Sequence, residues 1–393
     1  MSLLLISRSP DLQRLRDDGY DIEVTSGYLV VRAVPYVNAK AEVQRGTLAT
    51  ALNLAGDVTA KPATHVAYFE GEPPCHKDGS LIATIGRQSV REQIAESITA
   101  NYLFSSKPLD GYQDYHQLVT TYVAILSNPA QAIDPTATAQ TFPAIEATSD
   151  ESVFQYIDTA SSRAGIAAVT SKLELGKIAI VGLGGTGAYV LDLVAKTPVR
   201  EIHLFDGDIF AQHNAFRAPG AASIEDLRGK LKKVDYFHQA YARMHRHIFP
   251  HSYYIDETNA DELRGMDFVF LCLDRAGPRK LLVERLEEFD IPFVDTGMGL
   301  YEVEGFVSGV LRLTTSTQEQ RAHVQANKRI PFSEGDGDNL YARNIQIADL
   351  NALSAALAVI KWKKLFGFYR DYDHEHHSTY TIDGNMITNE DRP

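Results

Sequence analysis

The chain has 393 residues, of which 23% are charged and 44% hydrophobic, an ordinary globular composition. At roughly 150 residues per domain, this length predicts two domains or one large one. Lys and Arg number 38 against 51 Asp and Glu, so the formal net charge is −13. This acidic balance argues against a general binder of nucleic acid or anionic membranes, because phosphate recognition relies on clustered Lys and Arg.

The two cysteines, Cys75 and Cys272, are too few for a disulfide framework, and no CxxC pair offers a structural zinc site. The apolar run after Met1 is too short for a secretory signal, and it is not preceded by the basic residues that such a signal has. No stretch of 18 apolar residues predicts a membrane span. These features predict a soluble, cytoplasmic protein of a reducing compartment.

The first third of the chain is predicted to be rich in strands. Residues 21–32 read as a hairpin with glycine in its turn. Two helices are expected to follow. Residues 89–98 carry Val90 and Ile94 at a spacing of four, and residues 112–127 place several apolar side chains on one face.

A domain boundary is expected near residue 147. Residues 129–147 contain three scattered prolines and little periodicity, which is typical of a linker. Thr148 and Glu151 then resemble a capping box that starts a new helix. We therefore expect a smaller α+β domain over residues 1–147 and a second domain over residues 148–393.

The second domain is predicted to be a doubly wound α/β domain, because strands and helices alternate along it. Apolar strands are expected at 177–181, 201–205, 268–273 and 292–294, and helices at 188–196, 233–248 and 345–365.

A glycine-rich turn follows the first of these strands and opens a helix. It reads Gly182-Leu183-Gly184-Gly185-Thr186-Gly187. Glycines permit a tight turn and close backbone approach, and the helix N-terminus offers free N–H groups to phosphate. Asp206 ends the next strand, where an acid can bind a ribose hydroxyl. This pattern indicates a nucleotide site and not merely a structural turn, but NAD-dependent dehydrogenases and ATP-using enzymes both employ it.

The residues after Asp206 favour a triphosphate over NAD. Asp208 is followed by Asn214, Arg217 and a lysine-rich segment that ends at Lys233. A triphosphate carries about four negative charges, which need paired cations and a metal ion. Asp274, just past the strand at 268–273, supplies a carboxylate where Mg²⁺ could bind.

On these residues the chain resembles the ThiF/MoeB/HesA family of adenylating enzymes over roughly residues 160–370. The family is related to ubiquitin-activating enzymes, and the chain looks like the members found in bacterial ubiquitin-like conjugation operons. The resemblance implies that Asp206 holds the ribose and that Asp274 binds Mg²⁺. It also implies that the backbone of Gly182, Gly184, Gly185 and Gly187 approaches the nucleotide, and that Asn214, Arg217 and Lys233 grip the phosphates.

The resemblance further assigns Arg163 to an arginine ahead of the first strand, which in the family often reaches the active site of the partner subunit. The gap from Arg163 to the glycine turn is shorter than usual. The activity implied is the ATP- and Mg²⁺-dependent adenylation of the C-terminal glycine carboxylate of a ubiquitin-like protein. The implied partners are that protein, a second copy of the chain, and a carrier or conjugating-enzyme-like protein that residues 1–147 could dock.

Two other functions stay open. A catalytically inactive module could bind a nucleotide or a ubiquitin-like partner without turnover. An NAD(P)-dependent oxidoreductase is the other possibility, but that function would give Asn214, Arg217 and Lys233 no role in binding the cofactor.

The chain departs from the family in lacking a cysteine at the usual thioester position. Cys272 falls inside a predicted strand, where a thiol is expected to be inert core. Cys75 is expected to be more exposed, with His76 and Lys77 able to lower its pKa, so a thioester there stays open. An oxyester is conceivable on the hydroxyls of Thr314, Thr315, Ser316 and Thr317, in the segment that corresponds to the crossover loop of the family. A polar loop that binds the substrate tail is favoured instead.

Two histidine-containing segments are candidate metal sites, but for both another interpretation is favoured. The run His374-Glu375-His376-His377 is expected to be a solvated terminal tail. His65, Cys75, His76 and Asp78 lie around a Pro-rich loop that offers no regular spacing to fix a coordination geometry.

Overall fold

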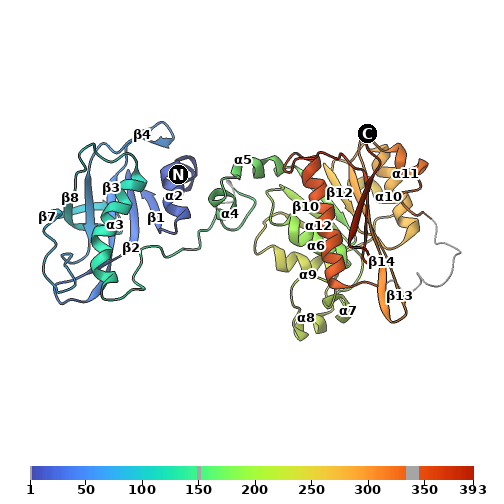
Figure 1. Cartoon of the computed structure of the whole chain (residues 1–393), viewed down its shortest axis with the longest axis horizontal. Helices are drawn as coiled ribbons and strands as arrows, with labels where there is room; N and C mark the ends of the chain where they lie inside the picture. The colour runs from blue at the N-terminus through green and yellow to red at the C-terminus, as the bar shows by residue number, and fades with distance from the viewer. Residues whose placement is uncertain (1, 148–151, 333–344) are drawn as a thin grey trace. The chain divides into compact units, whose positions relative to one another are not determined.

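The computed structural model describes residues 2–147, 152–332 and 345–393 (Figure 1). The chain divides into two compact units, one of Met1–Ile145 with Asp158–Gly165 and the other of Glu146–Ile157 with Ile166–Pro393. The capping box expected at Thr148 and Glu151 lies outside the described residues. Across the described ranges, no helix combines the length and the apolar character that crossing a membrane requires.

The first unit is built on a six-stranded antiparallel sheet with the order β1-β2-β3-β6-β8-β7. Its strands are β1 (Ile22–Thr25), β2 (Tyr28–Val37), β3 (Val43–Ala51), β6 (Val66–Glu70), β7 (Gly86–Ala95) and β8 (Ile98–Ser105), with a small separate ribbon of β4 (Leu54–Ala55) and β5 (Val58–Thr59). Its helices are α1 (Ser2–Arg8), α2 (Pro10–Asp17), α3 (Tyr115–Gln131) and α4 (Thr159–Arg163). The core forms where α3 packs on β2, around Leu118, Val119 and Tyr122.

The predicted hairpin at 21–32 is confirmed, since β1 pairs with β2 around a turn at Ser26 and Gly27. The helix predicted at 89–98 is wrong, because these residues form most of β7 and the start of β8. A spacing of four is a multiple of two, so it also places Val90 and Ile94 on one face of a strand. Both side chains pack in a small core on that face of the sheet.

The second unit is built on an eight-stranded mixed sheet with the order β11-β10-β9-β12-β13-β14-β15-β16. Its first five strands are parallel neighbours, and β13 to β16 pair in antiparallel fashion. The strands are β9 (Lys177–Val181), β10 (Glu201–Phe205), β11 (Ile248–His251), β12 (Phe268–Leu271), β13 (Phe293–Val303), β14 (Phe306–Ser316), β15 (His377–Thr381) and β16 (Met386–Glu390).

Helices cover both faces of this sheet. They are α5 (Ala167–Thr170), α6 (Gly185–Val194), α7 (Gln212–Ala215), α8 (Ile224–Gly229), α9 (Lys233–Tyr241), α10 (Ala276–Glu288), α11 (Ala322–Ala326) and α12 (Ala348–Leu365), with 3₁₀ turns at Ser171–Leu173 and Ala260–Leu263. In β9, Ile178 and Ile180 pack in the core beneath α6 and α12, whereas Ala179 and Val181 pack in the core beneath α10. The predicted fold class, a doubly wound domain preceded by a smaller α+β unit, is confirmed.

The strand order fixes where a ligand can bind. The strands β9 and β12 are neighbours in the parallel part of the sheet, and the chain leaves them toward helices on opposite faces of the sheet. In a doubly wound sheet, ligands bind beyond the carboxyl ends of the strands at such a switch point. The glycine turn follows β9, and Asp274 follows β12, so both are placed at this edge.

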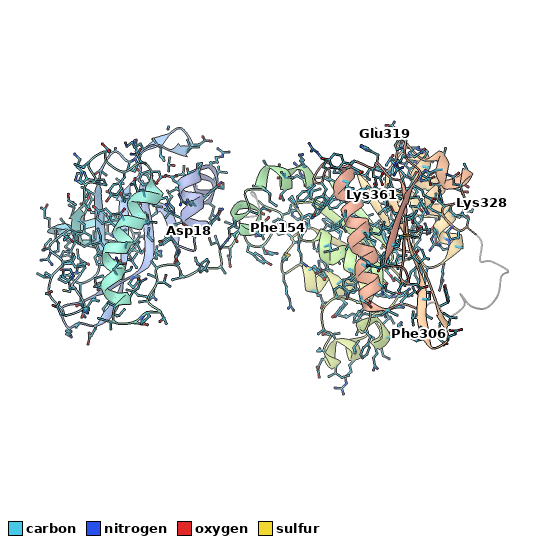
Figure 2. The ribbon with its side chains drawn as sticks, viewed as in Figure 1. Asp18, Phe154, Phe306, Glu319, Lys328 and Lys361 are labelled. Atoms are coloured by element: carbon cyan, nitrogen blue, oxygen red, sulfur yellow. The ribbon has the colours of Figure 1, made fainter. Side chains whose placement is uncertain are left out.

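The histidine-containing segment near the C-terminus is not the solvated tail that its sequence predicts. Glu375, His376 and His377 are buried, and His377 starts β15, which pairs with β14. Lys361 of α12 is also buried, and its Nζ lies 3.1 Å from Asp371 and 3.7 Å from Glu375 (Figure 2). These ion pairs and the strand pairing tie the segment to the sheet.

Candidate nucleotide site

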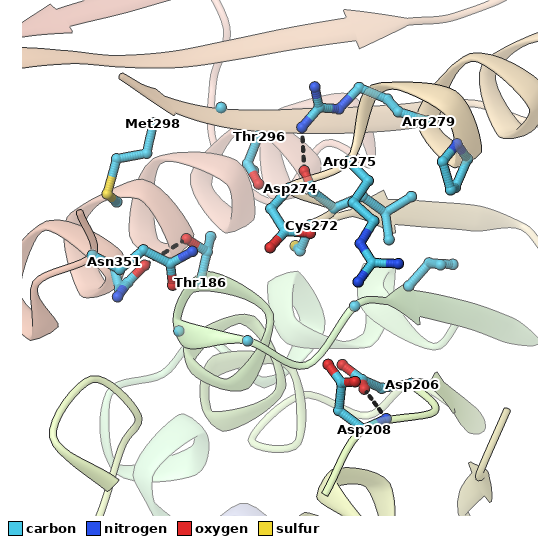
Figure 3. A pocket seen from close by; sticks show the side chains of 18 of the residues that line it. Thr186, Asp206, Asp208, Cys272, Asp274, Arg275, Arg279, Thr296, Met298 and Asn351 are labelled. Carbon is cyan, nitrogen blue, oxygen red and sulfur yellow. Dashed lines mark hydrogen bonds between the residues drawn. The ribbon is translucent and has the colours of Figure 1, made fainter. Parts of the chain in front are cut away.

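A cavity of about 1040 Å³ opens at the switch point, beyond the carboxyl ends of β9 and β12 (Figure 3). Nine of the eleven residues predicted for the site line it: Gly182, Gly184, Gly185, Asp206, Asp208, Asn214, Arg217, Lys233 and Asp274. They come from segments more than ninety positions apart in the chain. Within the described ranges, Gly187 and Arg163 are the two predicted site residues that do not line the cavity.

At two positions of the turn, Gly182 and Gly187, neighbouring backbone leaves no room for a side chain. Gly182 has φ of +91°, and a Cβ there would lie 2.6 Å from the carbonyl oxygen of Cys272. A Cβ on Gly187 would overlap the carbonyl oxygen of Gly182. Gly187 therefore shapes the turn from within and does not reach the cavity.

Gly184 differs from the other glycines of this turn because it faces open space. It caps the N-terminus of α6, and a Cβ there would meet no atom within 4 Å. By contrast, a Cβ on Gly185 would overlap the amide of Asn351, which accepts a hydrogen bond from the hydroxyl of Thr186 at 3.0 Å. The open space at Gly184, beside the first N–H groups of a ten-residue helix, is the arrangement that accommodates a phosphate group.

Asp206 joins the glycine turn to the loop after β10. Its Oδ2 accepts a hydrogen bond from the N–H of Leu183 at 2.7 Å, and its Oδ1 accepts one from the N–H of Asp208 at 2.8 Å. The residue is 6% exposed. Each carboxylate oxygen can accept more than one hydrogen bond, so Asp206 retains capacity for a hydroxyl group in the cavity.

Lys233, at the start of α9, brings a buried positive charge to the same edge. Its Nζ lies 2.7 Å from Oδ2 of Asp208 and 3.4 Å from Oδ2 of Asp206. Asp208 also accepts a hydrogen bond from the hydroxyl of Tyr254. Burial raises the pKa of Asp208, but the hydrogen bonds from Lys233 and Tyr254 outweigh this effect and leave the pKa below its ordinary value.

Asn214 and Arg217 contribute N–H donors that lack acceptors in the described part of the chain. Oδ1 of Asn214 accepts a hydrogen bond from the N–H of Ala211 at 2.9 Å, which fixes the side chain, but its buried Nδ2 has no partner there. The buried Nε of Arg217 has none either. Burial lowers the pKa of Arg217, and the charges of Asp274 and Asp208 oppose that effect. Both side chains line the cavity, so an anionic ligand there could accept hydrogen bonds from them.

Asp274 is exposed in the loop after β12, and it points into the cavity near Cys272 and Thr296 (Figure 3). In the residues that the structure describes, no three or more His, Cys, Asp or Glu side chains are grouped so that they could hold a metal ion. Mg²⁺ is commonly held by one or two carboxylates together with substrate phosphates and water. The residues present therefore fit a Mg²⁺ ion that binds together with a nucleotide.

Sequence reasoning missed a buried carboxylate that pairs with two arginines of the cavity wall. Asp295 of β13 is fully buried, with its Oδ1 3.2 Å from Nε of Arg279 and its Oδ2 paired with Arg312. Both arginines line the cavity. The local signal was an aspartate directly after the apolar residues Phe293 and Val294, because a carboxylate buried there requires a charged or hydrogen-bonding partner.

Neither cysteine has the surroundings of a reactive thiol. Cys272 lies just after β12 and lines the cavity, and burial raises its pKa to about 12. Cys75 was expected to be exposed with a lowered pKa, and this expectation is wrong. It is fully buried, bridging to Val37 and Leu81, and its burial raises its pKa.

The hydroxyls considered for an oxyester are also removed from the cavity. Thr314, Thr315 and Ser316 belong to β14 and are buried, although they were expected in a loop. Thr314 pairs with Nδ1 of His377 at 3.0 Å, and Thr317 with Nε2 of His376 at 3.0 Å. Part of the predicted crossover segment, residues 333–344, lies outside the described residues. Arg163 belongs to α4 of the first unit, where its guanidinium lies 5.8 Å from the ring centre of Phe142.

A model of the ThiF family matches residues 159–374, which is more than half of the chain. The chain belongs to the ThiF family. A second family model, described as a domain of unknown function (DUF6791), matches residues 10–159. Membership of the ThiF family supports an ATP-using adenylyltransferase that acts on a carboxylate.

Similar solved structures share little sequence with this ThiF-family chain. Escherichia coli MccB with MccA-N7isoAsn is 16% identical, with a TM-score of 0.47 over 60% of this chain and 70% of that one. PaaA is 18% identical, with a TM-score of 0.44 over 57% and 75% of the two chains. E. coli MccB with ATP is 17% identical, with a TM-score of 0.44 over 57% and 67%. No curated protein sequence matches the chain significantly.

Proposed function

We propose that this ThiF-family protein uses ATP and Mg²⁺ to adenylate the C-terminal glycine carboxylate of a ubiquitin-like protein. The observation that carries the proposal is the cavity at the switch point, which brings together an open space at Gly184, the buried Lys233 and an unpartnered Nε of Arg217. An NAD(P) site does not explain why the cations Lys233 and Arg217 line the same cavity as Asp274.

Each residue has a role that follows from its position. Asp206 and the backbone around Gly182, Gly184 and Gly185 hold the ribose and the phosphates. Asp208 orients Lys233. Lys233 and Arg217 place positive charge beside the phosphates, and Asn214 donates its free amide N–H to them. Asp274 is the residue that would hold Mg²⁺, which supplies further neutralisation of phosphate charge when bound.

The reaction needs little from the protein except positioning and charge. One oxygen of the substrate carboxylate attacks the α-phosphorus, so a new C(O)–O–P bond forms. The bond between the α-phosphorus and its bridging oxygen to the β-phosphorus breaks, and pyrophosphate leaves with the electron pair. No general base is required, because a carboxylate is already ionised at pH 7. Lys233 and Arg217 would offset the negative charge that builds up at the α-phosphoryl group.

We further propose that the adenylation domain spans residues 148–393 and that residues 1–147 dock a conjugating-enzyme-like partner. A homodimer in which Arg163 serves the neighbouring site is part of this proposal. Light scattering tests it, because a species of about 43.5 kDa at micromolar concentration contradicts the dimer. An active monomer would remove Arg163 from the site.

The exchange of labelled pyrophosphate into ATP tests the activity. The carboxylate donor is a ubiquitin-like protein ending in glycine, sought among proteins encoded beside this one, and the control donor is the same protein with its terminal glycine removed. We expect exchange with the first donor only. ATP binding without exchange for any such donor would favour an inactive binding module. Tight binding of NAD with no binding of ATP·Mg²⁺ would overturn the proposed function.

A further inference from the structure

Tyr254 is held at the rim of the cavity by contacts on both sides. Its carbonyl oxygen accepts a hydrogen bond from Nδ2 of Asn259 at 3.1 Å, and Oδ1 of Asn259 accepts one from the N–H of Asp256 at 2.8 Å. Its ring lies over Gly207, where a Cβ would be 2.8 Å from the ring. The side chain is therefore placed by the loop after β11, although the residue is 53% exposed.

The hydroxyl of Tyr254 donates a hydrogen bond to Oδ1 of Asp208, the same carboxylate whose Oδ2 lies 2.7 Å from Nζ of Lys233. Asp206 lies 3.4 Å from the same ammonium group. One buried positive charge is thus shared by two carboxylates, and the three groups together carry a net charge of −1. A phosphate that approaches Lys233 has to compete with both carboxylates.

A hydrogen-bond donor to Oδ1 of Asp208 weakens the competition between this carboxylate and a phosphate for Lys233. The hydrogen bond from Tyr254 stabilises the carboxylate and offsets part of its negative charge. Arg275 also lines the cavity, and its positive charge lowers the pKa of Asp208, as the hydrogen bond from Tyr254 does. In Figure 3 the guanidinium of Arg275 points toward Asp206 and Asp208.

We propose that Tyr254 is a positioning residue of the nucleotide site, which acts through Asp208 to leave Lys233 able to bind a phosphate of ATP. The inference rests on the proposed function, since it requires that ATP binds in this cavity. The hydrogen bond to Asp208, together with burial, raises the pKa of Tyr254 to about 12. The hydroxyl therefore remains a donor throughout the neutral range.

The test compares Tyr254→Phe with Tyr253→Phe, a matched control. The hydroxyl of Tyr253 bonds to Glu262 at 2.6 Å, and Tyr253 does not line the cavity. Calorimetric titration measures the affinity for ATP·Mg²⁺, and competition with ATP measures the affinity for adenosine, which lacks phosphates. We expect Tyr254→Phe to weaken ATP binding by about tenfold, the low end of what a hydrogen bond to a charged group contributes. Adenosine binding should be unchanged in Tyr254→Phe, and both affinities should be unchanged in Tyr253→Phe.

The same substitution in an Asp208→Asn background separates positioning from a general structural effect. If Tyr254 acts through Asp208, then Tyr254→Phe has no further effect on ATP binding once the carboxylate is gone. Equal losses for ATP and adenosine would show that Tyr254 is only a wall of the cavity, and an unchanged ATP affinity would show that it has no role. Either result overturns the inference and leaves the proposed function standing. If the unaltered protein does not bind ATP at all, the proposed function itself fails and the inference with it.

Discussion

The carboxylate of Asp295 is fully buried, and its Oδ1 lies 3.2 Å from Nε of the buried Arg279. Its other oxygen pairs with Arg312 on the neighbouring strand β14, so two guanidinium groups depend on one carboxylate. The cost of burying charges is offset here only while all partners are present. This cluster connects the strands β13 and β14 to the first turns of α10, and both arginines line the cavity.

Replacing Asp295 by Ala is expected to lower the free energy of unfolding by about 3–5 kcal/mol, because it leaves the buried Arg279 and the partly buried Arg312 without their counter-charge. Urea denaturation followed by circular dichroism measures this change. The matched control is Glu284→Gln, which removes the exposed pair with Lys280 on α10. That change is expected to cost less than about 1 kcal/mol. Similar losses for both variants would contradict the importance of the buried cluster.

Two glycines of one turn are expected to respond differently to alanine. In Gly187→Ala the new methyl group overlaps the carbonyl oxygen of Gly182, so the turn has to shift and thermal stability should fall. In Gly184→Ala the methyl group meets nothing within 4 Å, so thermal stability should be kept while ATP affinity is lost. Melting temperature and calorimetric titration with ATP·Mg²⁺ distinguish the two effects. A Gly184→Ala protein that binds ATP normally would show that the nucleotide does not approach this glycine.

Much of this site could be predicted from the sequence because its signals are local. The apolar run of β9, the glycine turn and Asp206 at the end of β10 are each readable within a few residues, and the doubly wound order brings their ends together. The contact of Tyr254 with Asp208 joins residues 46 positions apart, and the pairing of Asp295 with Arg312 depends on the register between β13 and β14. Cys75 was misjudged for the same reason, since its burial depends on a bridge to Val37.

Acid is expected to destabilise the second unit through two buried histidines, His376 and His377, at the start of β15. Burial, with the charges of Arg329 and Arg312, lowers the pKa of His377 to about 4, and burial also lowers the pKa of His376. Because the unfolded chain binds a proton more readily than the folded one, stability is highest above about pH 6.5 and falls as the pH drops toward 4. Urea denaturation at several pH values measures this slope.

The dependence on pH should become shallower in His377→Gln, which cannot be protonated. His374→Asn is the control, because His374 is exposed and asparagine tolerates its φ of +49°. An unchanged slope in His377→Gln would assign the loss of stability in acid to other groups.

Adenylation is expected not to depend on cysteine. Burial raises the pKa of both Cys75 and Cys272, so little thiolate forms at neutral pH, and neither is placed as a nucleophile. The double variant Cys75→Ser, Cys272→Ala should still exchange pyrophosphate into ATP when given its carboxylate donor. A covalent adduct with the donor that disappears both with dithiothreitol and in the double variant would reveal a thioester and contradict this expectation.

Asp274 is expected to carry the dependence on Mg²⁺. Asp274→Asn keeps the shape of the side chain but removes the charge beside Arg217, and a loss of about 3 kcal/mol in transition-state stabilisation slows the reaction more than 100-fold. The rate of pyrophosphate exchange should fall accordingly, and a higher Mg²⁺ concentration should be needed for half-maximal rate. The control is Asp256→Asn, because Asp256 also lines the cavity but bonds to Thr258 in its own loop. If both variants keep the Mg²⁺ requirement of the unaltered protein, the ion is held by the nucleotide phosphates without help from Asp274.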